Sequence, residues 1–292
     1  MSGSTRPPRV NSPVVLLLAA LLTVAACSSS EETASDQAGD GARTAAPARP
    51  DKTTPAPKPP PPPPETGRCR NLNFADISSF SNHRKELACG DAHTAYTFAV
   101  ETLPDEVAFD GVDIHNDAVQ TAAAQVCNTS FPAFIGGDAP TRALARLTVT
   151  YFLPEQGDFD RGAYWVRCDV VALRSAQMLA PLPRDVEGIL DDEGALSKLG
   201  VCSNGEPGAQ GSALVMCTEP HTYRALSALR LGDDNAAYPG DDTAKSTGEQ
   251  CEEVVGDVLG AEGGFTYSWT YPSAADWAGG QRFGYCWNQT SN

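Results

Sequence analysis

The chain has 292 residues and is acidic, with 21 Lys and Arg against 37 Asp and Glu and a formal net charge of −16. Nucleic-acid binding depends on Lys and Arg side chains that neutralise phosphates, so this charge argues against a nucleic-acid partner. The stretch from residue 67 to the C-terminus is long enough for two small domains, each with a modest core.

The N-terminal segment has the pattern of a secretory signal. Arg6 and Arg9 precede an apolar run at 14–26, which predicts a signal peptide over residues 1–26. The run is too short to span a bilayer, which takes about 20 apolar residues. Small residues before Cys27 resemble the bacterial lipobox, in which the cysteine is lipidated and carries palmitate among its acyl chains. We therefore expect Cys27 to anchor the chain to the extracytoplasmic face of the cell membrane; the alternative is ordinary cleavage beside a free thiol.

Residues 27–67 are the expected lipid-anchored linker. They lack apolar periodicity, are rich in Ala, Thr, Ser and Pro, and include the unbroken run Pro59–Pro64. Such a composition cannot bury enough surface to fold, so disorder is expected, with polyproline II structure near the end. The segment would act as a spacer that lifts the folded part off the bilayer. The alternative is a docking motif for a proline-reading domain.

The other eight cysteines fall into two successive quartets: Cys69, Cys89, Cys127 and Cys168, then Cys202, Cys217, Cys251 and Cys286. His93 follows the second cysteine of the first quartet by four residues, and His221 does the same in the second. Matching blocks also surround the third and fourth cysteines, which indicates an internal duplication. An even number of cysteines behind a secretory signal predicts disulfides. Four cysteines allow three pairings, and we expect each quartet to close within itself.

The repeat predicts an α+β fold with two tandem small disulfide-stapled domains. Each domain is expected to be a small antiparallel sheet with one packed helix. The expected boundaries are a first repeat at 68–175, a connector at 176–199 with a short helix within 186–198, and a second repeat at 200–292.

Strands and a helix can be placed within each repeat from their residue patterns. Mixed or alternating polar and large residues predict strands at 96–100, 148–152, 223–230 and 266–271, and a last strand carries the fourth cysteine of each quartet. An alanine-rich segment that begins at 116 and is capped by Gly136 predicts the helix. Pro132 is expected to break this helix into two pieces, whereas the second repeat has no such proline.

The second repeat resembles the septum-formation family of bacterial envelope proteins. The residues that carry this resemblance are Cys217, Pro220 and His221 in a Cys-x2-Pro-His motif, the helical Cys251, and Trp277, Gly280, Arg282 and Cys286 in a terminal Trp-x2-Gly-x-Arg-x3-Cys motif. The first repeat is a degenerate copy, with Ala92, Phe159 and Tyr164 in place of the proline, tryptophan and arginine. The resemblance implies an extracytoplasmic module associated by name with division, without an established chemistry.

His93 and His221 are the histidines that recur in both repeats. The first interpretation is structural: each would fasten a turn beside a disulfide by hydrogen bonding. Metal ligation is disfavoured, because a bridged cysteine is not a ligand and zinc needs three or four protein ligands. Acid–base catalysis is also disfavoured, because no nucleophile motif accompanies the histidines. We therefore expect no catalytic residues, no metal and no cofactor, and hence no enzyme.

Trp277 and Arg282 form the other candidate site. An aromatic face beside a bidentate donor would suit a carboxylate or a sugar. The alternative is that Trp277 caps the small core while Arg282 makes a surface ion pair.

The sequence as a whole predicts an extracytoplasmic, lipid-anchored interaction module of the bacterial cell envelope. Its expected partner is another envelope or division protein, or the cell wall. The alternative is a solute- or metal-binding lipoprotein with a site between the two repeats.

Overall fold

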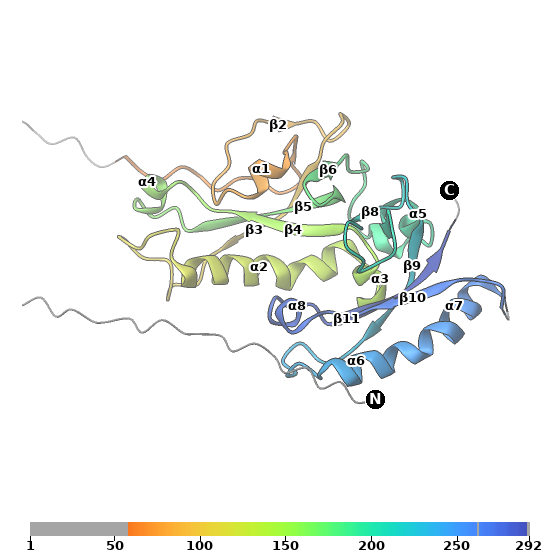
Figure 1. Cartoon of the computed structure of the whole chain (residues 1–292). Coiled ribbons are helices and arrows are strands. Elements are labelled where there is room, and N and C mark those ends of the chain that lie inside the picture. Colours follow the sequence, from red (N-terminus) through yellow and green to blue (C-terminus); the bar gives the residue numbers. More distant parts are fainter. Residues whose placement is uncertain (1–57, 262, 291–292) are drawn as a thin grey trace, which may run out of the picture. The chain divides into compact units, whose positions relative to one another are not determined.

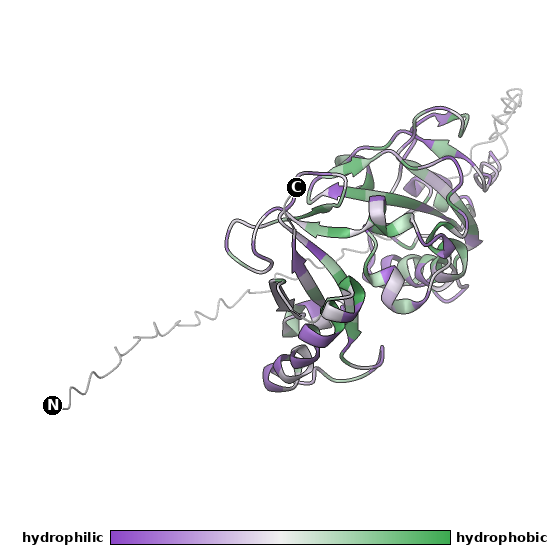
Figure 2. Ribbon diagram, turned by 90° about the vertical axis from the view of Figure 1, so that its right-hand side faces the viewer, coloured by the Kyte–Doolittle hydropathy of each residue, from purple (hydrophilic) through white to green (hydrophobic). Residues whose placement is uncertain are grey.

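The computed structural model describes residues 58–261 and 263–290, so the signal peptide and Cys27 lie outside the described residues. Two antiparallel sheets and several helices make up this part of the chain, which confirms the α+β class (Figure 1). In Figure 2 the hydrophobic colour runs along the central strands and recedes from many of the connecting loops. No helix in the described residues is both long and apolar enough to cross a membrane.

The first sheet has the strand order β2-β1-β3-β5-β4, and β6 pairs with β5 outside this path. Its strands are β1 (Cys69–Arg70), β2 (Glu86–Leu87), β3 (Ala95–Thr102), β4 (Leu147–Phe152), β5 (Trp165–Ser175) and β6 (Met178–Ala180). Its helices are α1 (Phe74–Ile77), α2 (Asp117–Ile135), α3 (Ala139–Ala143) and α4 (Gln156–Phe159). In the register of the sheet, Cys168 of β5 lies opposite Ala99 on one side and Tyr151 on the other.

The long helix α2 lies against one face of this sheet (Figure 1). It begins at Asn116, whose side chain accepts a hydrogen bond from the backbone N–H of Ala118, as an N-cap residue does. Val119, Ala123 and Cys127 recur at four-residue spacing and are fully buried against the sheet. The helix ends at Gly136, whose φ of 74° favours glycine.

The expected break at Pro132 is wrong, because α2 runs without interruption from Asp117 to Ile135. A proline removes one backbone hydrogen bond, but here it stands in the last turn, where little of the helix remains to be disrupted. The backbone N–H of Gly136 still donates to the Pro132 carbonyl at 3.3 Å and closes that turn.

The second sheet has the order β10-β11-β9-β7-β8. Its strands are β7 (Val201–Ser203), β8 (Leu214–Met216), β9 (Tyr223–Arg230), β10 (Tyr267–Thr270) and β11 (Phe283–Gln289). Its helices are α6 (Asp241–Thr247), α7 (Cys251–Leu259) and α8 (Ala274–Ala278), and a 3₁₀ turn at Gly248–Gln250 separates α6 from α7. The interruption expected in the first half of the chain therefore occurs in the second half.

Trp269 of β10 accounts for this interruption. Its indole N–H donates at 3.0 Å to the Ala244 carbonyl, which is the acceptor that an unbroken α-helix would offer to the N–H of Gly248. The indole also lies directly on Gly248, where an added Cβ would come within 2.2 Å of the ring. The side chain therefore needs a glycine at this point.

The connector is more closely integrated into the fold than expected. Strand β6 belongs to the first sheet, and the helix expected within 186–198 is two short pieces, a 3₁₀ turn at Ile189–Asp191 and α5 (Ala195–Leu199). An isolated β-bridge joins Ala145 to Gly200, and the Arg146 N–H donates to the Leu199 carbonyl at 2.7 Å. These bonds tie the connector to the first half of the chain and join that half directly to the start of the second.

The hydrophobic core is shared between the two halves. One cluster combines Val170 and Ala172 of β5 with Leu199 of α5 and Met216 of β8, and a second places Leu144 against Trp287 and other residues of the second sheet. Since a unit of about 100 residues buries a limited fraction of its apolar surface, joining the cores buries more than two separate domains would. The two halves are thus not independent hydrophobic units.

Candidate functional site

The eight cysteines of the two quartets form four disulfides. The pairs are Cys69–Cys89, Cys127–Cys168, Cys202–Cys217 and Cys251–Cys286. Each pair lies within its own quartet, in agreement with the hypothesis, and the structure selects one of the three pairings that the sequence left open. In each half the first disulfide closes the region before the long strand, and the second joins a helix to the last strand.

The two recurring histidines occupy equivalent turns. Nδ1 of His93 lies 2.9 Å from the carbonyl oxygen of Asp91, and Nδ1 of His221 lies 2.7 Å from that of Glu219. A carbonyl oxygen only accepts, so each Nδ1 carries the proton and donates. Each bond closes a turn that begins just after a disulfide cysteine, which is the geometry of the structural interpretation. His93 is almost fully buried, whereas His221 is partly exposed.

We expect His221→Ala to lower the free energy of unfolding by about 1 kcal/mol, the usual contribution of one hydrogen bond. His93→Ala should cost more, because its side chain is 1% exposed and its loss also leaves a void. Urea denaturation would measure both, with His115→Ala, at an exposed position, as the control. A His221→Ala protein of unchanged stability that no longer bound its partner would instead assign His221 to recognition.

Trp277 and Arg282 fasten a loop of the second half. The Trp277 side chain is 4% exposed, and its indole N–H donates to the Ala236 carbonyl at 2.8 Å. The Arg282 guanidinium stacks on this indole, with 4.4 Å from Cζ to the ring centroid, and donates to the Asp234 carbonyl at 2.7 Å. It also donates to the Trp277 carbonyl.

Trp277 thus packs in the core, and the contacts of Arg282 are with backbone carbonyls rather than with the carboxylate of an ion pair. In the first half, the residues at the corresponding sequence positions are Phe159 and Tyr164, whose rings meet edge to face at 4.9 Å. An aromatic contact there replaces the stacked cation. The geometry at Trp277 and Arg282 therefore favours packing over ligand binding.

A pocket of about 710 Å³ lies between the connector and the turn that His221 closes. Its apolar lining includes Leu182, Leu199 and Met216, and its charged lining residues are Arg174, Asp185, Asp192, Lys198 and Glu219. The Nε atom of Arg174, at the end of β5, donates to Oε1 of Glu219 at 2.8 Å. Because His221 holds the backbone of Glu219, the recurring histidine also positions this carboxylate.

The sequence did not identify the residues of this pocket, because the connector looked like a linker. The signal that was available is the apolar segment around Met178–Leu182, interrupted by prolines rather than by Gly and Ser. An apolar lining with both charges suits a short peptide segment or a small amphipathic molecule. Among residues 58–261 and 263–290, no group of three or more His, Cys, Asp or Glu side chains is placed to hold a metal ion.

Comparison with known proteins gives one family. The septum formation family matches residues 66–286, a stretch that includes all eight bridged cysteines and both recurring histidines. The match is therefore not confined to the segment from Cys217 to Cys286, whose motifs carried the resemblance. No curated protein and no solved structure matches the chain significantly. On this match, which covers most of its length, the chain belongs to the septum formation family.

Proposed function

We propose that this protein is an extracytoplasmic interaction module that takes part in septum formation and is anchored to the cell membrane through a lipid on Cys27. Family membership supports the role. Four disulfides support the compartment, because disulfides persist mainly in oxidising spaces. The module binds another envelope or division protein, or the cell wall, and catalyses no reaction.

We further propose that the fold arose by duplication, with repeats at 68–175 and 200–292 around a connector at 176–199. The strand orders support this proposal. In the first sheet the order is β2-β1-β3-β5-β4, and in the second, read from its other edge, it is β8-β7-β9-β11-β10. Each strand of one list occupies the place of its counterpart in the other, and the disulfides follow the same correspondence. The repeats then merged their cores.

The observation that carries the binding proposal is the pocket spanned by the Arg174–Glu219 ion pair. The two partners come from opposite sides, one from β5 and one from the turn before β9. Both side chains are partly exposed, so the pair contributes at most about 1 kcal/mol to stability. A pair that does little for the fold yet sits over an apolar lining is suited to recognition of a charged and apolar segment.

Reversing one charge of this pair tests the proposal. We expect Arg174→Glu to reduce capture of the partner from envelope extract at least tenfold while the free energy of unfolding changes by less than about 1 kcal/mol. Arg230→Glu is the matched control, because Arg230 and Asp234 form a comparable exposed pair away from this pocket. Equal capture by wild type and Arg174→Glu would contradict the proposal.

The second candidate function is binding of a small solute in the same pocket. Its volume of about 710 Å³ supports this alternative, since ligand pockets commonly range from about 300 to 1,000 Å³. Soluble wall fragments or metal ions would then raise the melting temperature of the wild type but not of Arg174→Glu. An interaction module that recognises only another protein would show no shift with either addition.

A further inference from the structure

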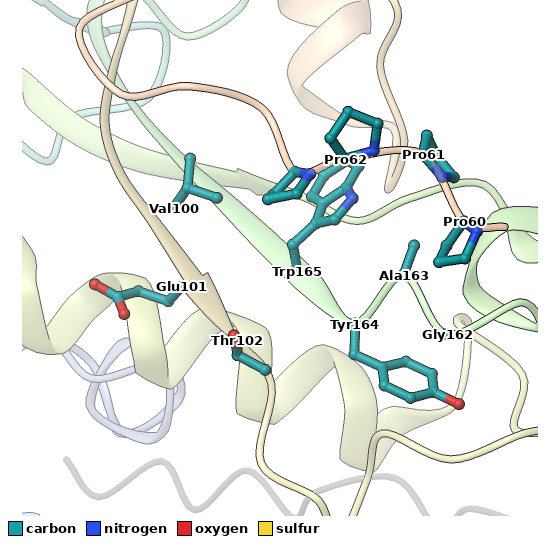
Figure 3. A pocket seen from close by; sticks show the side chains of 11 residues that line it. Pro60, Pro61, Pro62, Val100, Glu101, Thr102, Gly162, Ala163, Tyr164 and Trp165 are labelled. Carbon is teal, nitrogen blue, oxygen red and sulfur yellow. The ribbon is translucent and has the colours of Figure 1, made fainter.

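The proline run at the start of the described chain lies against the first sheet. Pro60, Pro61, Pro62 and Pro63 line a pocket of about 430 Å³ together with the end of β3 and the start of β5 (Figure 3). The aromatic residues of this pocket are Tyr164 and Trp165. Part of the expected linker therefore contacts the folded domain.

Backbone hydrogen bonds hold the chain just after the run. The Gly67 N–H donates to the Thr97 carbonyl, and the Thr97 N–H donates to the Arg68 carbonyl, both at 2.8 Å. Gly67 has a φ of 73°, a conformation that favours glycine. The chain is thus fixed to β3 at this point, so the prolines that precede it lie beside the end of β3 and the start of β5.

Trp165 has an unsatisfied hydrogen-bond donor at this pocket. Its indole Nε1 atom is buried and has no hydrogen-bond partner among the described residues. A buried donor without an acceptor is costly, and a native protein rarely keeps one without a reason. The prolines already line this pocket and leave the donor without a partner, so the indole contributes to the contact through its ring.

Grooves that recognise polyproline II helices share these features. They offer aromatic side chains to the proline rings, and they profit from a ligand that is already stiff and loses little entropy on binding. In Figure 3 the ring of Pro62 lies beside the Trp165 indole, and Pro61 and Pro60 continue along the same side of the pocket. The four prolines remain exposed on their outer sides, so the contact is shallow.

We propose that the pocket formed by Val100, Tyr164 and Trp165 is a binding site for a polyproline II helix, and that its occupant is the chain's own Pro60–Pro63 segment. The run is then a latch that fastens the tether to the folded domain through contact of its proline rings with the aromatic side chains of the pocket. A proline-reading site in this chain recognises the proline run of the same chain, so no separate proline-reading domain is needed.

Covalent connection explains how a shallow site stays filled. A segment joined to its site by a short stretch of chain has an effective concentration in the millimolar range, which is enough to occupy a weak site. Opening the latch would free about nine residues between 58 and 67, or on the order of 30 Å of extended chain at about 3.1 Å per residue. This role is independent of the pocket at Arg174.

The test is exchange of the latch in the full-length protein. Replacing Pro60, Pro61, Pro62 and Pro63 by Ser should empty the site, and a synthetic peptide with the sequence of residues 58–65 should then bind. Binding is followed by the NMR resonance of the Trp165 indole N–H and by calorimetry. The wild type should bind this peptide at least tenfold more weakly, because its own run competes. Replacing Pro47, Pro50 and Pro55 by Ser is the matched control and should leave the peptide excluded.

Two substitutions of the tryptophan separate its contributions. In the serine background, Trp165→Phe keeps an aromatic ring and should retain peptide binding, while Trp165→Ala should abolish it. A peptide of the same length with Gly and Ser in place of the prolines should not bind. The proposal is overturned if the serine variant does not bind the proline peptide, or if wild type and variant bind it equally. A concentration-dependent dimer that exchanges its latches would overturn the assignment of the occupant.

Discussion

Replacing Asp169 by Ala is expected to lower the free energy of unfolding by about 3–5 kcal/mol, the usual cost of removing one partner of a buried ion pair. Asp169 is fully buried on β5, and Nη2 of Arg167 lies 3.0 Å from its Oδ2 atom. Burial lowers the pKa of the Arg167 guanidinium, and Asp169 opposes that shift. Without the carboxylate, the guanidinium would be left charged and unpaired in the protein interior.

The network around this pair makes the loss larger. Thr97 donates to Asp169 at 2.6 Å and accepts from Arg70 at 2.6 Å, so three strands of the first sheet meet at these side chains. The Arg167 guanidinium also lies 4.3 Å from the centroid of the Phe152 ring. These groups all point away from α2, because side chains on a strand alternate between its two faces.

Urea denaturation measures this effect, and a double substitution is the informative control. Arg167→Met with Asp169→Leu removes both charges and should cost much less than Asp169→Ala, since hydrophobic pairs often replace buried ion pairs without loss. Glu219→Ala, in an exposed pair, should cost less than about 1 kcal/mol. A loss below about 1 kcal/mol for Asp169→Ala would show that the pair is hydrated or dispensable.

Removing the disulfide between Cys127 and Cys168 is the second large effect. The double change Cys127→Ala with Cys168→Ala opens a loop of 41 residues, and the chain-entropy model gives a cost of about 4 kcal/mol for a loop of that size. Both cysteines are fully buried between α2 and β5, so the substitution also leaves a void in the core. We expect a destabilised protein whose helix α2 exchanges its amide hydrogens much faster than wild type.

The matched comparison is the pair Cys202 and Cys217, which closes 15 residues. Its removal should cost about 3 kcal/mol by the same model, and Cys217 is not fully buried. Chemical denaturation of both double variants under oxidising conditions shows which disulfide contributes more to the free energy of unfolding. If the shorter loop proved the more costly to open, the entropic account would be wrong, and local packing at the bridges would have to explain the difference.

The sequence was a good guide to the fold wherever local patterns decide the structure. The strands at Ala95–Thr102 and Tyr223–Arg230 and the helix cap at Gly136 lie close to where residue patterns place them. The helix break was assigned to the wrong half, because it depends on a tertiary contact. Trp269 of β10 donates to the Ala244 carbonyl of α6, and no local sequence pattern indicates this contact.

The site was harder to predict because it depends on packing between distant segments. Arg174 and Glu219 are 45 residues apart and look like ordinary surface charges until the connector packs against the second half. The recurring histidines could be identified from their spacing, and their turn-closing role follows from local chemistry. The roles of Trp277 and Arg282 required the loop around Asp234, whose position no motif indicates.

The pairing of the bridges has a consequence for how the chain matures. Each cysteine of the two quartets bonds to its immediate neighbour in cysteine order, across separations of 20, 41, 15 and 35 residues. A polypeptide that enters an oxidising space N-terminus first, with the Cys27 thiol blocked by the proposed lipid, would present these thiols in order, and the second thiol of each pair would find only its correct mate unpaired. Oxidation in order of arrival thus yields the native connectivity, and reshuffling by an isomerase becomes unnecessary.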